Sequence, residues 1–239
     1  MQPRKIFQSI ILSPFIIRTT HKIRTLFFKD HDSFLKCATG VIHVGASTGG
    51  ERKIYRAYNL PVVWIEPIPE VYEMLCKNIE GYPNNLAIRS LVTDKNDVEY
   101  LFNVSNNDGA ASSILEFSHH KEIWPDVVYE RQIKLKSITL SDLLKKQCIN
   151  IALYNTLVID AQGAELLVLK GAGDILNDIR FVKVEASDFE LYKNCCQLND
   201  VVEFLAQLSF REIARHQFAE RLNGGACYNV IFKKYSLTK

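Results

Sequence analysis

One stretch near residue 40 constrains the fold more than any other part of the chain. It begins with a short apolar run, residues 41–44, and continues into a turn with glycines at positions 45, 49 and 50. A second apolar run, residues 62–65, ends in Glu66, which lies 21 residues after Gly45. A glycine turn between a strand and a helix, with an acid about 20 residues further on, is the layout of a nucleotide-binding βαβ unit. The pattern therefore predicts a parallel sheet with a binding site at the carboxyl ends of its strands.

The spacing of the glycines narrows the kind of ligand. A dinucleotide-binding turn follows G-x-G-x-x-G, whereas this turn reads Gly45-x-x-x-Gly49-Gly50. Glycine lets a backbone approach a ligand closely, and the wider turn suits a nucleoside-containing ligand that has no pyrophosphate. Glu66 would then accept hydrogen bonds from both ribose hydroxyls. The alternative is an ordinary tight turn from strand to helix, with no ligand beside it.

Size, charge and cysteine content exclude several classes of protein. The 239 residues suffice for one large domain, or for one domain with an extension. The net charge of +2 gives no strong field that would attract nucleic acid. The six cysteines form no C-x-x-C pair, and Cys195 and Cys196 are adjacent, which argues against both a zinc site and a disulfide scaffold. Reduced thiols indicate an intracellular compartment, so we expect a cytoplasmic protein.

The first 39 residues differ in character from the rest. They are basic, with no acid before Asp30, and they contain two short apolar clusters separated by Ser13 and Pro14. A membrane span needs about 20 apolar residues, and a signal peptide needs a clean apolar core; neither pattern is present. We expect residues 1–39 to form a helical extension of a domain at residues 40–239. Contact of the extension with an anionic membrane surface is the less favoured alternative.

From residue 41 onward, the hydrophobic pattern alternates between strands and helices. This alternation predicts a parallel sheet covered on both faces, with right-handed crossovers. The expected helices are residues 52–58, 71–79, 140–146, a segment ending at 170, and 200–208. The expected strands are residues 41–44, 62–65, 86–92, 98–104, 133–138, 156–159, 181–184, 210–214 and 227–232, the last two as a hairpin at the sheet edge.

Ligands of such sheets bind outside the carboxyl ends of the strands. Several polar and acidic residues lie at or just past the expected strand ends, although any single one could instead be a helix cap. We expect them to form one cluster, made of His43, Gly45, Glu66, Thr93, Asp94, Asp160, Gln162 and Glu185.

Four sequence pieces occur in a characteristic order: residues 42–49 (IHVGASTG), 64–69 (WIEPIP), 112–115 (SSIL) and 158–166 (VIDAQGAEL). Together they resemble the FkbM-type methyltransferases, over roughly residues 40–233. The resemblance implies an α/β, Rossmann-like class I methyltransferase fold. Its sheet would be mostly parallel and seven-stranded, with helices on both faces and an antiparallel edge strand. One departure is His43, which stands where most class I enzymes have an acid.

The resemblance implies S-adenosylmethionine as the cofactor, a nucleoside derivative without phosphate. We expect it to contact His43, Gly45, Ala46, Ser47, Gly49, Glu66, Pro67, Thr93 and Asp160. We expect the acceptor substrate to contact Ser112, Ser113, Gln162, Glu165 and Glu185.

Methylation of a hydroxyl group benefits from a general base, because a hydroxyl is a poor nucleophile. Asp160 is our first candidate, since it ends the most apolar strand. His120 is the second, although His119 and His120 could equally be a surface pair. The acidic oxygens of the rim would suit magnesium or calcium, but their spacing does not require a metal and we expect none.

We therefore expect an enzyme that methylates a hydroxyl group on a small-molecule or glycan acceptor, with no nucleic-acid partner. Two alternatives remain. One is an inert module that binds the cofactor without chemistry, and the other is a nucleotide-dependent oxidoreductase. The missing G-x-G-x-x-G pattern counts against the oxidoreductase.

Overall fold

A computed structural model describes residues 32–235 of the chain, so most of the expected N-terminal extension lies outside the described residues. The described helices are η1 (Ser33–Cys37), α2 (Arg52–Ala57), α3 (Pro69–Ile79), η2 (His119–Glu122), α4 (Leu140–Lys146), η3 (Ile151–Leu153), α5 (Glu165–Ala172), η4 (Gly173–Asn177) and α6 (Leu198–Gln207). The described strands are β1 (Val41–Val44), β2 (Val62–Glu66), β3 (Asn85–Arg89), β4 (Leu91–Thr93), β5 (Glu99–Ser105), β6 (Tyr129–Thr139), β7 (Thr156–Ile159), β8 (Phe181–Ser187), β9 (Phe210–Glu220) and β10 (Ala226–Lys234).

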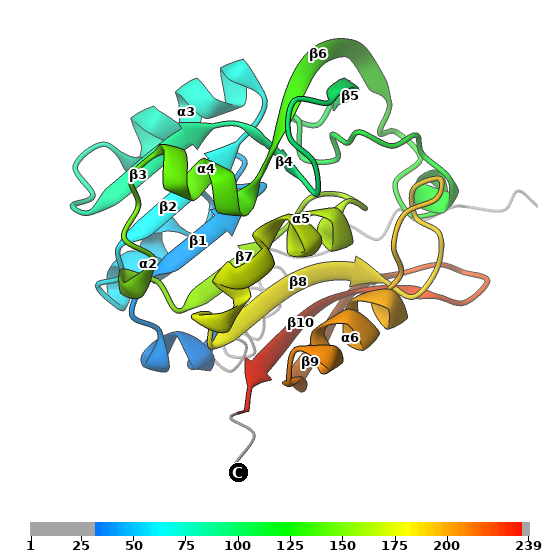
Figure 1. Cartoon of the computed structure of the whole chain (residues 1–239). Coiled ribbons are helices and arrows are strands. Elements are labelled where there is room, and N and C mark those ends of the chain that lie inside the picture. Colours follow the sequence, from blue (N-terminus) through cyan, green and yellow to red (C-terminus); the bar gives the residue numbers. More distant parts are fainter. Residues whose placement is uncertain (1–31, 236–239) are drawn as a thin grey trace, which may run out of the picture. The chain divides into compact units, whose positions relative to one another are not determined.

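The main sheet has seven strands in the order β3-β2-β1-β7-β8-β10-β9 (Figure 1). Neighbouring strands from β3 to β8 are parallel, and β10 pairs antiparallel with both β8 and β9. The expected α/β fold with a mostly parallel seven-stranded sheet is therefore confirmed, as is the hairpin at its edge. The strand that runs against the others is β10, which lies one position in from the edge.

The sheet carries helices on both faces because its central strands are apolar on both sides. All four residues of β1 and all four of β7 are buried. Ile42 and Val44 belong to the large core that also includes buried residues of α4, α5 and α6, while the ring of His43 points to the other face and contacts Tyr55 of α2. Helix α4 begins at a side-chain cap, since the Asp142 N–H donates to Thr139 Oγ1 at 3.2 Å.

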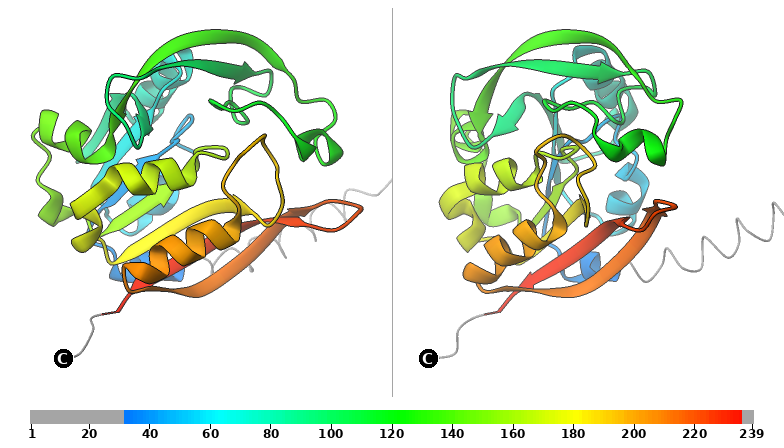
Figure 2. Two further views of the ribbon diagram at one scale, coloured as in Figure 1. Left: turned by 45° about the vertical axis from the view of Figure 1, so that its right-hand side comes forward. Right: turned by 90° about the vertical axis from the view of Figure 1, so that its right-hand side faces the viewer.

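The segment 86–92, expected as one strand, is divided between two sheets. Strand β3 ends at Arg89, and β4 leaves the main sheet to pair in parallel with β6, which pairs antiparallel with β5. The break falls at Ser90, whose N–H donates to the Glu66 carbonyl at 3.3 Å. An apolar pattern alone cannot reveal such a change of partner strand. The three-stranded sheet arches over the carboxyl ends of the central strands (Figure 2).

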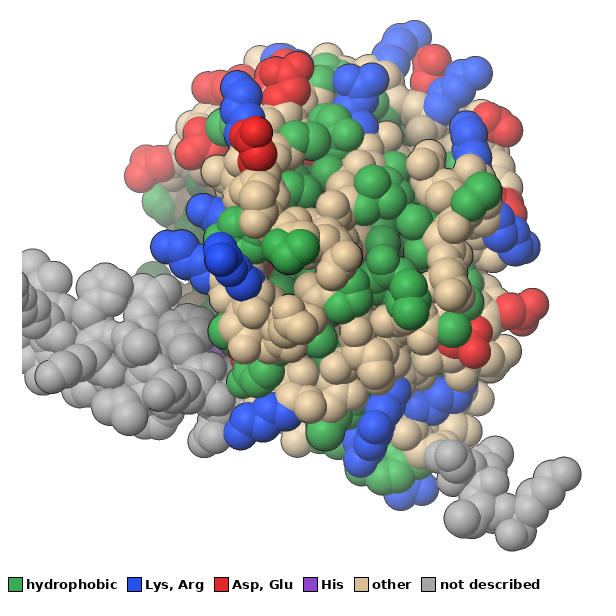
Figure 3. All heavy atoms as spheres, turned by 90° about the vertical axis from the view of Figure 1, so that its left-hand side faces the viewer, with side chains coloured by type: hydrophobic (Ala, Val, Ile, Leu, Met, Phe, Trp, Pro, Cys, Tyr) green, Lys and Arg blue, Asp and Glu red, His purple; other side chains and the backbone are tan. Residues whose placement is uncertain are grey.

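The side of the domain that carries α3 and β3 exposes apolar side chains in the middle of its face (Figure 3). Met74 and Leu86, which belong to these two elements, are exposed. Within residues 32–235, none of the helices combines the length and apolar character that crossing a membrane requires.

Candidate active site

The turn after β1 is fixed by the strands on both sides of it. The N–H groups of Gly45 and Ala46 both donate to the Ile65 carbonyl at 3.0 Å. Gly45 has φ of +77°, and a Cβ atom at this position would lie 1.7 Å from the Asp160 backbone carbonyl oxygen. Glycine is therefore needed at position 45 because the ends of β1 and β7 approach each other closely. The sequence predicted a close approach between this backbone and a ligand. In the structure, the atoms that a side chain would meet belong to the chain itself.

Glu66 ends β2 and holds two loops together at the rim of the sheet, where the carboxyl ends of its parallel strands lie. Its Oε2 accepts a hydrogen bond from the Ser47 N–H at 2.9 Å, and its Oε1 accepts one from the Ile68 N–H at 2.9 Å. Burial raises the pKa of this carboxyl to about 7, against the opposing effect of the two backbone hydrogen bonds. A carboxylate has about four lone-pair sites, so Glu66 keeps acceptor capacity for a ligand in the cavity beside it.

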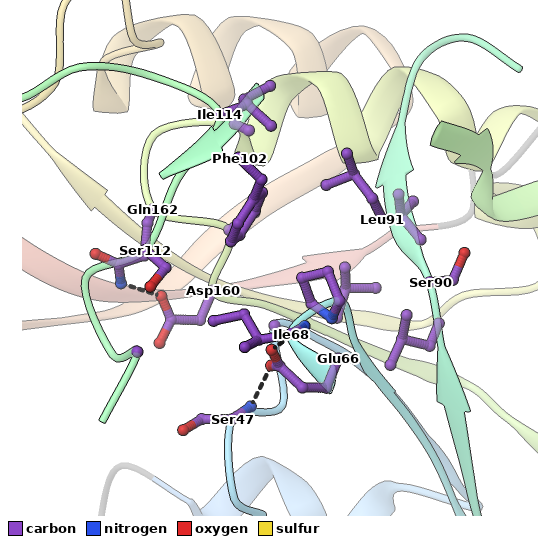
Figure 4. Close-up of a pocket in the computed structure, with 18 of the residues that line it drawn as sticks. Ser47, Glu66, Ile68, Ser90, Leu91, Phe102, Ser112, Ile114, Asp160 and Gln162 are labelled. Atoms are coloured by element: carbon purple, nitrogen blue, oxygen red, sulfur yellow. Dashed lines mark hydrogen bonds between the residues drawn. The ribbon is translucent and has the colours of Figure 1, made fainter. Parts of the chain in front are cut away.

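This cavity contains about 690 Å³ of empty space, its open mouth included. Figure 4 shows Glu66 and Asp160 on its wall, with Ile68, Leu91 and Phe102 around the space between them. The three apolar side chains come from the loop after β2, from β4 and from β5. An apolar enclosure next to a hydrogen-bonding carboxylate suits a purine ring attached to a ribose.

Asp160 follows β7 and lies in the wall of the same cavity. Its Oδ1 accepts a hydrogen bond from the Gln162 side-chain amide at 2.5 Å. Burial raises the pKa of Asp160 to about 7, opposed by the Gln162 hydrogen bond and supported by the negative charge of Glu165. A carboxyl group with a pKa near neutrality is suited to accept a proton at physiological pH.

Glu165 and Glu185 face a second, smaller cavity of about 300 Å³, and Gln162 lines both cavities. Glu165 Oε1 accepts hydrogen bonds from the N–H groups of Ala161 at 3.1 Å and Gly163 at 2.9 Å, so it stabilises the entry to α5. Burial raises the pKa of both glutamates. Nowhere in residues 32–235 do three or more His, Cys, Asp or Glu side chains form a group that could hold a metal ion.

The expected cofactor and acceptor residues, apart from Glu165 and Glu185, fall into two groups. Gly45, Ser47, Glu66, Pro67, Ser112, Asp160 and Gln162 line the larger cavity. His43, Ala46, Gly49, Thr93 and Ser113 do not. The His43 Nδ1 lies 3.2 Å from the hydroxyl of Tyr55, on the face of the sheet that carries α2. Burial lowers the pKa of His43. Thr93 ends β4, which belongs to the second sheet. Its hydroxyl hydrogen-bonds to the backbone N–H and carbonyl of Lys95 in the following turn, both at 3.2 Å.

His120, the second candidate base, lies inside an aromatic cluster that we define as Phe117, His120, Trp124, Tyr129 and Tyr192. Its ring stacks on Phe117 at 4.2 Å between centroids, and its side chain is 3% exposed. Burial lowers the pKa of His120 to about 4, and His120 does not line either cavity. The alternative of a surface pair is correct for His119 alone, which is exposed. Its Nδ1 lies 2.6 Å from Glu122 Oε1.

The sequence did not reveal the apolar side of the cavity. Ile68, Leu91, Phe102 and Ile114 lie in its wall and were not among the expected site residues. One signal was available: Ile68 stands two residues after the predicted ribose-binding acid, where the chain must turn across the rim. No local pattern marks Phe102, because its place in the wall depends on how the second sheet folds over the first.

The raised pKa of Asp160 makes a prediction about stability. An unfolded Asp has a pKa near ~3.9, so burial in the folded state favours the protonated form. The stability associated with this group is present below pH ~4 and is lost as the pH rises through about 7. Asp160→Asn removes this dependence. In urea unfolding, the free energy of unfolding of the variant relative to the unmodified chain should rise by about 1–3 kcal/mol from pH 5 to pH 8. A difference that is independent of pH would contradict the assigned burial.

Comparison with known proteins supplies a family. Residues 43–212 match the family model of the methyltransferase FkbM domain. None of the curated proteins matches the chain.

Several solved structures are similar at low identity. An uncharacterized protein from Listeria monocytogenes serotype 4b has 8% identity and a TM-score of 0.47, with 82% of this chain and 61% of that chain covered. TrmK from M. capricolum, solved with S-adenosyl-homocysteine, has 9% identity and a TM-score of 0.46, with 84% and 65% covered. An rRNA methylase from Streptococcus thermophilus has 12% identity and a TM-score of 0.46, with 95% and 100% covered. The chain spans 61% to 66% of the length of the first structures that it matches.

Proposed function

The chain belongs to the FkbM family of methyltransferases, and we propose that it transfers the methyl group of S-adenosylmethionine to a hydroxyl group on a glycan or small-molecule acceptor. The sulfonium of this donor supplies an already activated methyl group, so the chain needs no covalent intermediate. The task of the protein is to hold donor and acceptor in line and to exclude water, which can supply several kcal/mol of the barrier.

The larger cavity supports this proposal because its wall carries groups for both functions required, cofactor binding and proton removal. Glu66 has acceptor capacity for the ribose hydroxyls, and Ile68, Leu91 and Phe102 offer an apolar enclosure for the adenine ring. Asp160 lies in the same wall and would take the proton of an acceptor hydroxyl. The presence of Glu66 and Asp160 in one cavity wall is the observation that carries the proposal.

Asp160 is the better of the two candidate bases on chemical grounds. A general base is most effective when its pKa lies near the working pH. The pKa of Asp160 is about 7, whereas that of His120 is about 4, which makes the imidazole a weak base. Asp160 also faces the cavity, and His120 is enclosed by aromatic rings.

The charges around the site favour a neutral acceptor with several hydroxyl groups. Neither cavity has Lys or Arg among its described lining residues, while Glu66, Asp160, Glu165 and Glu185 contribute carboxyl groups. Phosphates are usually recognised by Arg and Lys, so this wall does not suit a nucleic-acid backbone. Carboxyl groups and amides are good partners for sugar hydroxyls.

The test is incubation of the full chain with S-adenosylmethionine and a panel of glycans, sugar alcohols, amines and RNA, with S-adenosylhomocysteine release as the readout. We expect release only with hydroxyl-bearing glycans or small molecules, and the methyl group on an oxygen of the product. Methylation of the RNA or of an amine would overturn the acceptor class. Binding of S-adenosylhomocysteine without transfer to any acceptor would indicate an inert module.

Glu66→Ala should weaken the binding of S-adenosylhomocysteine. The variant removes the acceptor for the ribose and leaves the N–H groups of Ser47 and Ile68 without their partner. Loss of a charged hydrogen-bond partner costs about 1–3 kcal/mol, or roughly 5–150-fold in affinity. Isothermal titration measures this, with Glu70→Ala as the matched control, because Glu70 is an exposed acid of α3 that pairs with Arg131. Equal affinities for the two variants would show that Glu66 does not hold the cofactor.

A further inference from the structure

Two long connections meet above the carboxyl ends of β7 and β8 (Figure 2). One contains Phe117 and the other contains Tyr192, and these two residues form an isolated antiparallel bridge. The Ser118 N–H donates to the Leu191 carbonyl at 3.1 Å, and the Lys193 N–H donates to the Glu116 carbonyl at 2.8 Å. These backbone bonds fix the position of Tyr192, whose side chain is 0% exposed.

The Tyr192 hydroxyl is aimed at the residue that contacts Asp160. It donates a hydrogen bond to Gln162 Oε1 at 2.5 Å, and its other neighbour is the Ala111 carbonyl at 3.4 Å. An amide oxygen can only accept a hydrogen bond, so with this orientation of Gln162 the Tyr192 hydroxyl is the donor and the amide NH₂ points away from it.

Gln162 thereby presents its NH₂ group to the carboxyl groups of the rim. The Nε2 donates to Asp160 Oδ1 at 2.5 Å and lies 3.5 Å from Glu185 Oε1. The backbone of Gln162 is held as well, since the Ser113 hydroxyl donates to its carbonyl oxygen at 2.7 Å and its φ is +50°. Gln162 was expected to bind the acceptor, but both ends of its amide are engaged within the protein.

We infer that Tyr192 is a positioning residue for Asp160 and that it acts through the side-chain amide of Gln162. The inference rests on the proposed function, in which Asp160 is the base. The Tyr192 hydroxyl keeps the amide NH₂ directed at Asp160, and this donor stabilises the ionised carboxylate that accepts the proton. Without the hydroxyl, the amide can turn and present its oxygen instead, which favours a protonated Asp160.

The other charged groups around Asp160 set the background for this effect. They are Glu51 in the turn before α2, Glu165 on α5, and Lys183 and Glu185 on β8. The three glutamates disfavour the ionised form of Asp160, and Lys183 favours it. Burial holds the pKa of Tyr192 well above its usual range, so its hydroxyl remains a donor throughout the pH range of the test.

The experiment is an NMR titration of the full chain labelled with ¹³C at the Asp carboxyl carbons, with Asp160→Asn to assign the signal. Tyr192→Phe should raise the apparent pKa of Asp160 by about one unit, because a donor to the carboxylate is lost. Tyr129→Phe is the matched control. Tyr129 belongs to the same aromatic cluster, but its hydroxyl donates to the Leu115 carbonyl at 2.7 Å and not to Gln162. The control should leave the titration of Asp160 unchanged.

A second variant tests whether the effect passes through the amide. In a Gln162→Met background, Tyr192→Phe should cause no further shift of the Asp160 titration. An unchanged titration in Tyr192→Phe, or an equal shift in Tyr129→Phe, would overturn the inference.

The acidic limb of the pH–rate profile gives a separate readout that depends on the proposed function. It should move to higher pH in Tyr192→Phe by the same amount as the titration. A shifted titration with an unmoved limb would leave the link from Tyr192 to Asp160 intact and would reject Asp160 as the base.

Discussion

Asp160→Asn is expected to lower the turnover number by about 10²–10⁴-fold, the usual contribution of a general base. The substitution keeps the shape of the side chain and an oxygen that can accept the Gln162 hydrogen bond, but it removes the capacity to take a proton. Cofactor affinity should change little, since the ribose is assigned to Glu66 and not to Asp160. Single-turnover kinetics with saturating S-adenosylmethionine would measure the loss, and titration with S-adenosylhomocysteine would measure the affinity.

The rival base provides the control for this prediction. His120→Phe keeps an aromatic ring against Phe117 and Trp124, where the imidazole now packs, and removes both ring nitrogens. We expect this variant to retain most of its turnover. If His120→Phe is inactive while Asp160→Asn is active, the histidine carries the proton and our assignment is wrong. If both are active, positioning of the substrates is sufficient without a base.

Gly45→Ala is expected to destabilise the chain by more than about 4 kcal/mol, a loss typical of severe backbone clashes. The added Cβ would lie 1.7 Å from the Asp160 carbonyl oxygen and 2.7 Å from its carbonyl carbon, and φ is +77°. These atoms belong to the backbone at the ends of β1 and β7, which cannot move aside without breaking the sheet. Denaturant unfolding of the two chains would measure the difference.

Gly50→Ala is the matched control for the turn. Gly50 lies in the same glycine-rich segment, but a Cβ there would meet no heavy atom within 4 Å. Its free energy of unfolding should therefore stay close to that of the unmodified chain. A folded, normally stable Gly45→Ala protein would show that the β1 and β7 ends are further apart than the structure indicates.

Much of the fold could be predicted because its central strands are marked by short stretches of the sequence. The apolar runs at residues 41–44 and 156–159 are buried along their whole length, as expected of central parallel strands. Glu66 was predicted to lie at the rim from its position at the end of a strand, and the structure places it there with its carboxylate at the cavity wall.

The rest of the site depends on contacts between distant segments. Segment 86–92 was expected as one strand, yet the chain changes sheets at Ser90. As a result Leu91 lies in the cavity wall and Thr93 does not. The burial of His120 arises from Phe117 on its own loop and Tyr192 from another. The residues next to His120, from Ser118 to Glu122, are polar, and they gave no sign that the ring would be enclosed.

The structure of the full chain with S-adenosylhomocysteine bound would test the central claim most directly, because it would show which residues hold the cofactor. We predict that the ribose hydroxyls will hydrogen-bond to Glu66, that the adenine will lie against Ile68, Leu91 and Phe102, and that the sulfur will be directed toward Asp160. A cofactor bound outside this cavity, or bound in it with its sulfur directed away from Asp160, would contradict the account.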